Sequence, residues 1–177
     1  MSQTFRSFRY FDKEYTFDEW VRREILKNKG TDNIAQTKDL EKICSEIGLV
    51  HKNNISKAEL FDLLLQAGFS SEKFAKRFSI GVGSHAFQDT FGITNEDVKR
   101  LERHGALTIV SKERYRAFGK NCYAPLYDLT EICQMTDEDM QALLEAYPKQ
   151  VRRKKPVPSQ PYQQEDYEYE PEEEIER

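Results

Sequence analysis

Short polar and cationic side chains gather on one side of a helix predicted over residues 95–104. Polar groups at a helix start reach base edges and phosphates in a DNA major groove, and lysine and arginine neutralise the backbone. This chemistry is recognition of a polyanion, with no bond made or broken. The alternative is a solvated helix face whose cations pair with Glu96 and Glu102. The residues expected to face outward are Thr94, Asn95, Lys99, Arg100 and Arg103.

A tight turn before this helix must position the face. Gly92 supplies the left-handed backbone that such a turn needs. Thr94 followed by Asp97 predicts a capped helix start. The segments on either side of Gly92 therefore predict two short helices that cross steeply, as in a helix-turn-helix. Their inward side chains are expected to be Phe87, Phe91, Ile93, Val98 and Leu101.

The segment after Gly105 predicts a small sheet and then a further helix. Strands are expected over 106–110, 114–118 and 124–127, with a turn at Gly119-Lys-Asn121. Asp128 or Thr130 is expected to cap the helix that contains Glu131-Ile-Cys133. Gly81-Val-Gly83, upstream of the helix pair, is interpreted as a linker.

Residues 84–133 resemble the MerR and excisionase class of winged helix-turn-helix. The resemblance lies in the order of Arg100-Leu-Glu-Arg-His-Gly-Ala-Leu107, a basic hairpin, and Leu126-Tyr-Asp-Leu-Thr-Glu-Ile132. It implies that Arg114, Arg116 and Lys120 lie on the wing and approach the DNA backbone or minor groove. Ordinary exposed strand cations are the alternative for these three residues.

Residues 37–66 resemble a SAP domain, a pair of helices joined by an extended loop. Gly48-Leu49 matches the end of its first helix and Lys57-Ala-Glu-Leu60 the start of its second. SAP domains bind duplex DNA weakly, and the resemblance implies that Lys52 and Lys57 contact DNA here. An ordinary helical hairpin produces the same pattern and is the alternative.

The charges are unevenly distributed along the 177 residues. The chain has a net charge of -4, but residues 161–177 hold eight acids against one base, which leaves 26 bases and 23 acids over residues 1–160. A mildly basic body thus carries an acidic tail. Proline and low hydrophobicity predict disorder over residues 148–177. The tail is interpreted as a competitor of DNA, a docking segment or a solubilising extension.

The residues that commonly carry catalysis form no recognisable constellation. His51, His85 and His104 are isolated, and no phosphate-binding glycine loop is present. The three cysteines lack CxxC spacing, so we expect no catalytic residues, no metal and no cofactor. Cys44 and Cys133 lie on apolar helix faces and are expected in the core. Neither a membrane span nor a secretory signal is predicted, and the reduced cysteines suit a cytoplasmic protein.

We therefore expect a mainly α-helical fold with a small β wing. Its parts are a SAP-like module with an N-terminal hairpin (1–68), a winged helix-turn-helix domain (69–147) and a charged tail (148–177). The expected function is non-enzymatic binding of double-stranded DNA, in transcription control or as a replication or recombination accessory of a phage or mobile element. The alternative is an inhibitor or adaptor of a nucleic-acid enzyme, of the phage anti-defence type, that binds protein through its fold or acidic tail. The target sequence and the oligomeric state, a homodimer included, stay open.

Overall fold

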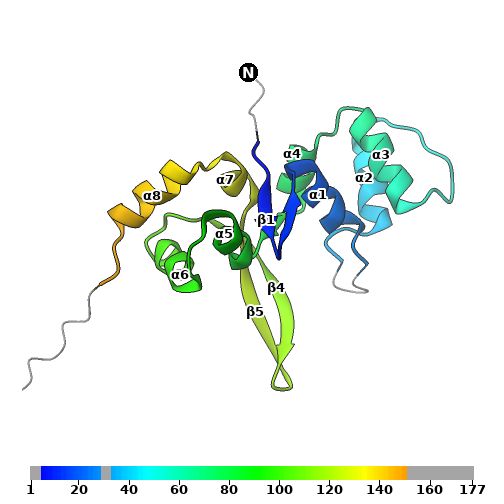
Figure 1. The fold of residues 1–177 in the computed structure, drawn as a ribbon. Helices are drawn as coiled ribbons and strands as arrows, with labels where there is room; N and C mark the ends of the chain where they lie inside the picture. Colours follow the sequence, from blue (N-terminus) through cyan, green and yellow to red (C-terminus); the bar gives the residue numbers. More distant parts are fainter. Residues whose placement is uncertain (1–4, 29–32, 151–177) are drawn as a thin grey trace, which may run out of the picture.

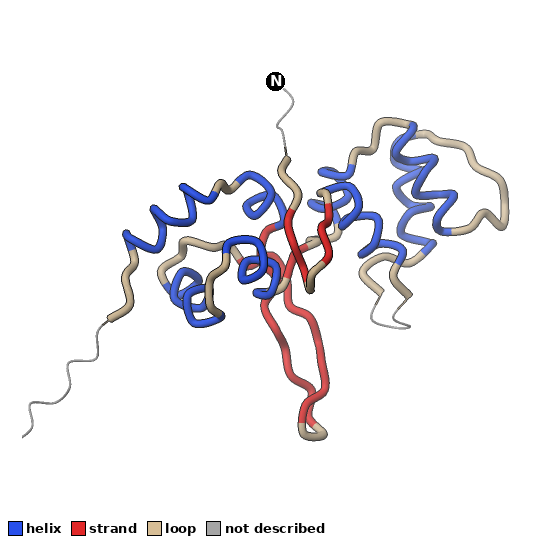
Figure 2. The backbone as a smooth tube through the Cα atoms, viewed as in Figure 1, coloured by secondary structure: helices blue, strands red, loops and turns tan. Residues whose placement is uncertain are grey.

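The computed structural model describes residues 5–28 and 33–150, which are mainly α-helical with two small antiparallel sheets (Figures 1 and 2). This is the mixture of helix and sheet that the sequence predicts. The expected disorder of the tail falls, from residue 151 on, outside the described residues. The elements in chain order are β1 (Phe8–Tyr10), β2 (Lys13–Tyr15), α1 (Phe17–Leu26), α2 (Thr37–Ile47), α3 (Lys57–Gln66), α4 (Ser71–Arg77), β3 (Gly81–Val82), α5 (Ser84–Phe91), α6 (Asn95–Arg103), β4 (Ile109–Ala117), β5 (Lys120–Asp128), α7 (Leu129–Gln134) and α8 (Asp137–Ala146).

Helices α1, α3, α6 and α8 each begin at a capping serine or threonine, and the cap at Thr94 is the predicted one. The hydroxyls of Thr16, Ser56, Thr94 and Thr136 each accept a hydrogen bond from the amide three residues further on. Each cap satisfies an amide that has no partner within its own helix. Capping by short polar residues is a local interaction, which is why the sequence alone locates the helix start at Thr94.

The larger sheet has the order β3-β5-β4, and its main part is one long hairpin. Three short strands and a turn at residues 119–121 were expected. Instead β4 and β5 pair along nine residues each, with Phe118 and Gly119 forming the turn. Pro125 lies within β5, where β4 pairs on one side. On the other side β3 pairs only with Tyr127 and Asp128, so that edge of β5 is open at Pro125, and an open edge tolerates a residue without an amide hydrogen.

The segment interpreted as a linker contributes the third strand of this sheet. Gly81 and Val82 are buried and pair with Asp128 and Tyr127. A Cβ atom on Gly81 would lie 2.7 Å from the carbonyl oxygen of Tyr127. Glycine is required there because the backbones approach closely, and a two-residue strand leaves no periodic pattern from which to predict it.

One cluster of buried side chains connects most of the elements. It includes Phe8 and Trp20 near the N-terminus, Leu60 in α3, Phe87 in α5 and Tyr127 in β5. Cys44 and Cys133 belong to the same cluster, as predicted from their helix faces. A shared core of this kind fixes the helices and the sheet relative to one another.

Contacts run between the two parts that the sequence divides at residue 68. The amide of Arg9 donates to Thr90 Oγ1 of α5 (2.9 Å), and the indole Nε1 of Trp20 donates to the Gly81 carbonyl (3.1 Å). The N-terminal hairpin thus docks on α5, the first helix of the expected helix pair. The division into residues 1–68 and 69–147 stays a prediction.

The molecule has two ends and a projection between them. The pair α2 and α3 lies at one end, α6 and α8 lie at the other, and the β4–β5 hairpin extends away from the body between the two (Figure 1). Within the described ranges, no helix is long and apolar enough to cross a membrane.

Candidate nucleic-acid interface

The α5–α6 segment places a polar helix face at the surface. Gly92 ends α5 in the left-handed region (φ 65°) and reverses the chain, as predicted. Thr94 then caps α6 with a complete capping box, in which Asp97 accepts from the Thr94 amide at 3.0 Å. Val98 and Leu101 face the core. Four side chains that the sequence assigned to the outward face are indeed exposed: Thr94, Asn95, Lys99 and Arg103.

Arg100 does not belong to that exposed face, and its predicted outward orientation is wrong. Only 8% of its surface is exposed. Its Nε donates to the Tyr147 carbonyl at the end of α8 (2.7 Å), and its NH2 group lies 2.8 Å from Asp97 Oδ1. The physical reason is that α8 packs beside α6 and supplies a carbonyl acceptor, which draws the guanidinium inward.

Asp97 remains ionised through these interactions. Burial by itself would raise the pKa of the Asp97 carboxyl. The backbone and hydroxyl of Thr94, together with the charge of Arg100, lower that pKa to below its ordinary value. The pair of Asp97 and Arg100 therefore locks the start of α6 to the end of α8.

An open groove of about 950 Å³ runs between α6 and the chain that leaves α8. Lys99 and Arg103 lie on one side of it, and Lys149 lies on the other. His104 and Tyr147 also line it, and their rings stack 4.8 Å apart between centroids. Glu96 is the acidic side chain on its rim. Sequence reasoning missed Lys149, because only the fold brings the end of α8 to this helix.

The β4–β5 hairpin carries a second basic surface, on one of its two faces. Residues directly opposite each other in an antiparallel pair share a face, and alternate residues along a strand do so too. Lys112, Arg114 and Arg116 therefore lie on one face, and Tyr123 stands opposite Arg114 on that face. Lys112 was not predicted as a site residue, although its spacing of two from Arg114 is the signal that identifies it.

Lys120 differs from the other cations that the resemblance placed on the wing. It pairs with Ala117, which puts it on the opposite face from Arg114 and Arg116. The hairpin thus has one strongly basic face and one face with a single lysine near the tip. The strand register places Lys112, Arg114 and Arg116 on one face. The three shorter strands predicted from the sequence have no defined register, so they did not predict this arrangement.

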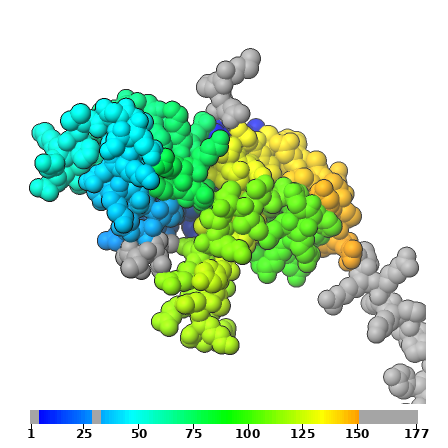
Figure 3. All heavy atoms as spheres, turned by 180° about the vertical axis from the view of Figure 1, so that it is seen from behind, coloured from blue at the N-terminus to red at the C-terminus, as the bar shows by residue number. Residues whose placement is uncertain are grey.

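A hydrogen bond connects the two basic surfaces. The Tyr127 hydroxyl, in β5, donates to Glu102 Oε2 of α6 at 2.6 Å. Burial, and then the bond to the Glu102 carboxylate, raise the pKa of Tyr127 above its ordinary value, so the phenol stays protonated as a donor. The contact holds α6 beside the base of the hairpin, as the space-filling view also shows (Figure 3).

The two lysines of the SAP-like segment lie away from these surfaces. Lys52 is exposed in the loop between α2 and α3, and Lys57 is half-buried at the start of α3. Burial lowers the pKa of Lys57, and the nearby charge of Asp39 acts in the opposite direction. These elements stand at the far end of the molecule from α6 (Figure 1), so the predicted site residues form separate groups.

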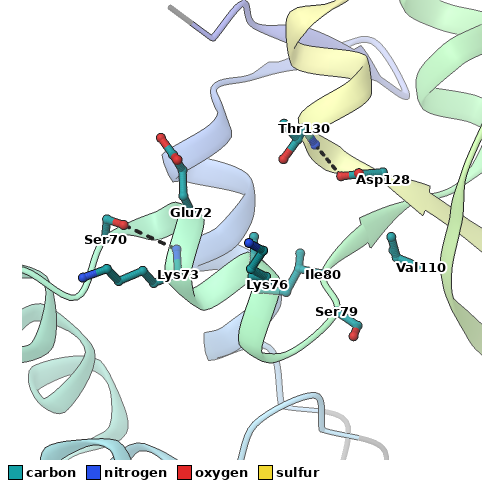
Figure 4. Close-up of a pocket in the computed structure, with 10 residues that line it drawn as sticks. Ser70, Glu72, Lys73, Lys76, Ser79, Ile80, Val110, Asp128 and Thr130 are labelled. Atoms are coloured by element: carbon teal, nitrogen blue, oxygen red, sulfur yellow. Dashed lines mark hydrogen bonds between the residues drawn. The ribbon is translucent and has the colours of Figure 1, made fainter. Parts of the chain in front are cut away.

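A smaller cavity of about 530 Å³ lies between α4 and the start of α7 (Figure 4). Lys73 and Lys76 reach its rim. Two of its other polar side chains serve as helix caps: Ser70 Oγ accepts from the Lys73 amide, and Asp128 Oδ1 accepts from the Thr130 amide. These two side chains are therefore engaged within the fold.

Cys44 and Cys133 are buried free thiols. Burial, followed by the charge of Asp128, raises the pKa of Cys133 to about 12, and burial also raises the pKa of Cys44. Both thiols are poor nucleophiles in that state. Within residues 5–28 and 33–150, no group of three or more histidine, cysteine or carboxylate side chains is arranged to hold a metal ion.

No protein-family model matches this chain, and no curated protein or solved structure matches it either.

Proposed function

We propose that this chain is a non-enzymatic protein that binds double-stranded DNA through α6 and the β4–β5 hairpin. The observation that carries the proposal is the presence of two basic surfaces on elements that the Tyr127–Glu102 bond joins: the α6 groove with Lys99, Arg103 and Lys149, and the hairpin face with Lys112, Arg114 and Arg116. Clustered cations are the electrostatic signature of a phosphate-backbone partner.

The residues have different roles in this proposal. Lys99 and Arg103 neutralise phosphates, while Asn95, exposed in the first turn of α6, is placed to meet a base edge. The hydroxyl oxygen of Thr94 accepts a hydrogen bond from the Asp97 amide, so Thr94 serves mainly to fix the start of α6. Arg100 is assigned no contact with DNA, because it is buried and its Nε and one terminal nitrogen already bond the Tyr147 carbonyl and Asp97.

The hairpin acts as the wing of a winged helix-turn-helix in this proposal. Its basic face approaches the backbone or the minor groove, with Lys120 on the reverse side near the tip. The SAP-like pair of α2 and α3 provides a weaker contact through Lys52 and Lys57. The biological role proposed is transcription control, or an accessory step in replication or recombination of a phage or mobile element, in the cytoplasm.

One observation favours a second candidate function. The burial of Arg100 leaves α6 with fewer exposed cations than its sequence contains, and Glu96 lies among those that remain. A protein-binding inhibitor or adaptor of a nucleic-acid enzyme needs no basic groove and instead engages its partner through its fold or its acidic tail.

The decisive experiment measures DNA affinity against salt. We compare the full chain with Lys99→Ala/Arg103→Ala on a 30-base-pair duplex of arbitrary sequence by fluorescence anisotropy. Affinity falls as salt rises, and each phosphate contact makes the plot of log affinity against log salt steeper by about 0.9. The double variant lacks two contacts, so its plot is expected to be less steep by about 1.8, and its affinity at low salt is expected to be about tenfold weaker. Lys73→Ala/Lys76→Ala, which removes two exposed cations from α4, is the matched control and is expected to bind as the wild type does. Equal slopes for both double variants would overturn the groove assignment and favour the adaptor.

A further inference from the structure

The tip of the β4–β5 hairpin carries an aromatic side chain that folding does not use. Phe118 is fully exposed (102%), and it is the first residue of a two-residue turn between Ala117 and Lys120. Its φ is 52° and that of Gly119 is 72°, so both turn residues are left-handed. Asparagine or glycine is the favoured residue at such a position, and a bulky side chain is disfavoured there. Phe118 thus has a left-handed backbone conformation that is unfavourable for phenylalanine, and its ring gains no stabilisation from burial.

The other hairpin of the chain provides an internal comparison. Phe11 occupies the same turn position between β1 and β2, with φ 48°, followed by Asp12 with φ 62°. Its ring, however, packs against His85 at 4.3 Å and against Tyr10 at 4.6 Å, and the residue is only 58% exposed. Phe11 is therefore explained by packing within the molecule, whereas Phe118 is not.

Further exposed aromatics accompany Phe118. Tyr123, on the basic face opposite Arg114, is 62% exposed, and Tyr115, on the other face, is 49% exposed. The end of the hairpin stands clear of the other elements in all three views of the whole molecule (Figures 1, 2 and 3). Three exposed rings thus lie within nine residues of a hairpin that projects from the body.

The charges around these rings select the kind of partner. Lys112, Arg114, Arg116 and Lys120 flank them, against Glu113 as the acidic side chain of the distal strands. Rings among cations are the combination with which proteins hold unpaired nucleotides, since the rings stack on bases while the cations follow the phosphates. To insert into an intact duplex, an aromatic side chain must first separate two stacked base pairs, which costs free energy. Stacking on an unpaired base does not carry this cost.

The geometry points to Phe118 as a stacking residue for an unpaired base, so that the hairpin tip directs this protein to DNA in which paired and single-stranded segments meet. This inference rests on the proposed function, because α6 holds the paired segment. It adds the class of DNA preferred and the residue that sets the preference.

The test compares a forked DNA with an intact duplex that has the same paired sequence. Phe118→Asn is the informative variant, because asparagine accepts the left-handed turn, so that the hairpin folds at least as stably. Phe11→Asn makes the same change at the matching turn and is the control. The readouts are anisotropy for affinity and 2-aminopurine fluorescence at the unpaired position for stacking.

The wild type is expected to favour the fork over the duplex. Phe118→Asn is expected to bind the fork about tenfold more weakly, to lose the fluorescence quenching, and to leave duplex affinity within about twofold. Phe11→Asn is expected to match the wild type on both DNAs. If Phe118→Asn binds and quenches the fork as the wild type does, while duplex binding still depends on Lys99 and Arg103, this inference fails and the proposed function stands. If the wild type binds neither DNA, both fail.

Discussion

A glycine and a tryptophan show most directly how single residues hold this fold together. Gly81 sits where β3 meets β5, and its carbonyl accepts from the indole of Trp20 at 3.1 Å. Gly81 therefore allows β3 and β5 to approach closely, and its carbonyl also accepts the hydrogen bond from Trp20 of α1. This contact joins the N-terminal hairpin and helix to the sheet that carries the basic hairpin.

Gly81→Ala is expected to lower the free energy of unfolding by about 2 kcal/mol, because the added methyl group would lie 2.7 Å from the Tyr127 carbonyl oxygen and 2.8 Å from Val110 Cγ2. The measurement is urea unfolding followed by the fluorescence of Trp20, the single tryptophan of the chain. Gly83→Ala is the matched control: no atom lies within 4 Å of its added Cβ, and the loss is expected to stay below about 1 kcal/mol. Equal losses would show that crowding at β3 is not the cause.

At the scale of elements, the packing of α6 against α8 decides which cations are available. Asp97 and Arg100 form the buried part of that contact, with side chains 13% and 10% exposed. A buried guanidinium without its carboxylate is strongly destabilising. In the capping box of α8, Asp139 has the same position as Asp97 but is exposed, and the charge of Arg6 acts on it where Asp97 has the bonded Arg100.

Asp97→Asn is expected to lower the free energy of unfolding by about 2 kcal/mol at pH 7, since it leaves Arg100 buried without a counter-charge. The pKa of Asp97 is below its ordinary value in the folded protein, so its contribution is complete above the unfolded pKa of about 4 and is lost as the pH falls through the lower folded pKa. Wild type and variant should therefore converge in urea titrations as the pH falls below about 4. Asp139→Asn weakens an exposed cap and removes a charge near Arg6 without leaving a buried cation, and it should lose no more than about 1 kcal/mol. An equal loss in both variants would contradict a special role for the Arg100 pair.

The sequence predicts the parts of this region that depend on neighbouring residues. The cap at Thr94, the left-handed Gly92 and the buried cysteines all follow from local patterns. The orientation of Arg100 and the role of Lys149 do not, because both depend on the end of α8, where Tyr147 lies 47 residues beyond Arg100. The strand register that separates Lys120 from Arg116 is set by the two-residue turn at Phe118 and Gly119, whereas the sequence predicts the turn at Gly119-Lys-Asn121.

At the scale of the whole molecule, charge is divided between a basic body and an acidic tail. Residues 1–160 have a net charge of +3, and the full chain has -4. The last described residues, Pro148 to Gln150, line the α6 groove, so the acidic residues are attached to the chain close to the proposed DNA contact. Attachment at that point raises their local concentration at the groove.

Removal of residues 161–177 is expected to tighten binding of a duplex about three- to tenfold at low salt, because the tail repels phosphate and competes for the groove. The difference should fade as ionic strength rises and the charges are screened. The control is a chain of unchanged length in which the eight acids of this segment are replaced by glutamine or asparagine, which should bind as the truncated chain does. Anisotropy at several salt concentrations gives the comparison. Unchanged DNA affinity with loss of an otherwise detectable protein partner would favour the adaptor.

The bond from Arg100 to the Tyr147 carbonyl has a consequence for where this protein tolerates shortening. It spans 47 residues of sequence and makes the last turn of α8 part of the surface of α6. A stop codon just before Tyr147 would therefore remove the carbonyl that accepts from the Arg100 guanidinium. It would also remove the ring that stacks on His104. A safe boundary for a shortened chain lies beyond Tyr147, even though α8 itself ends at Ala146.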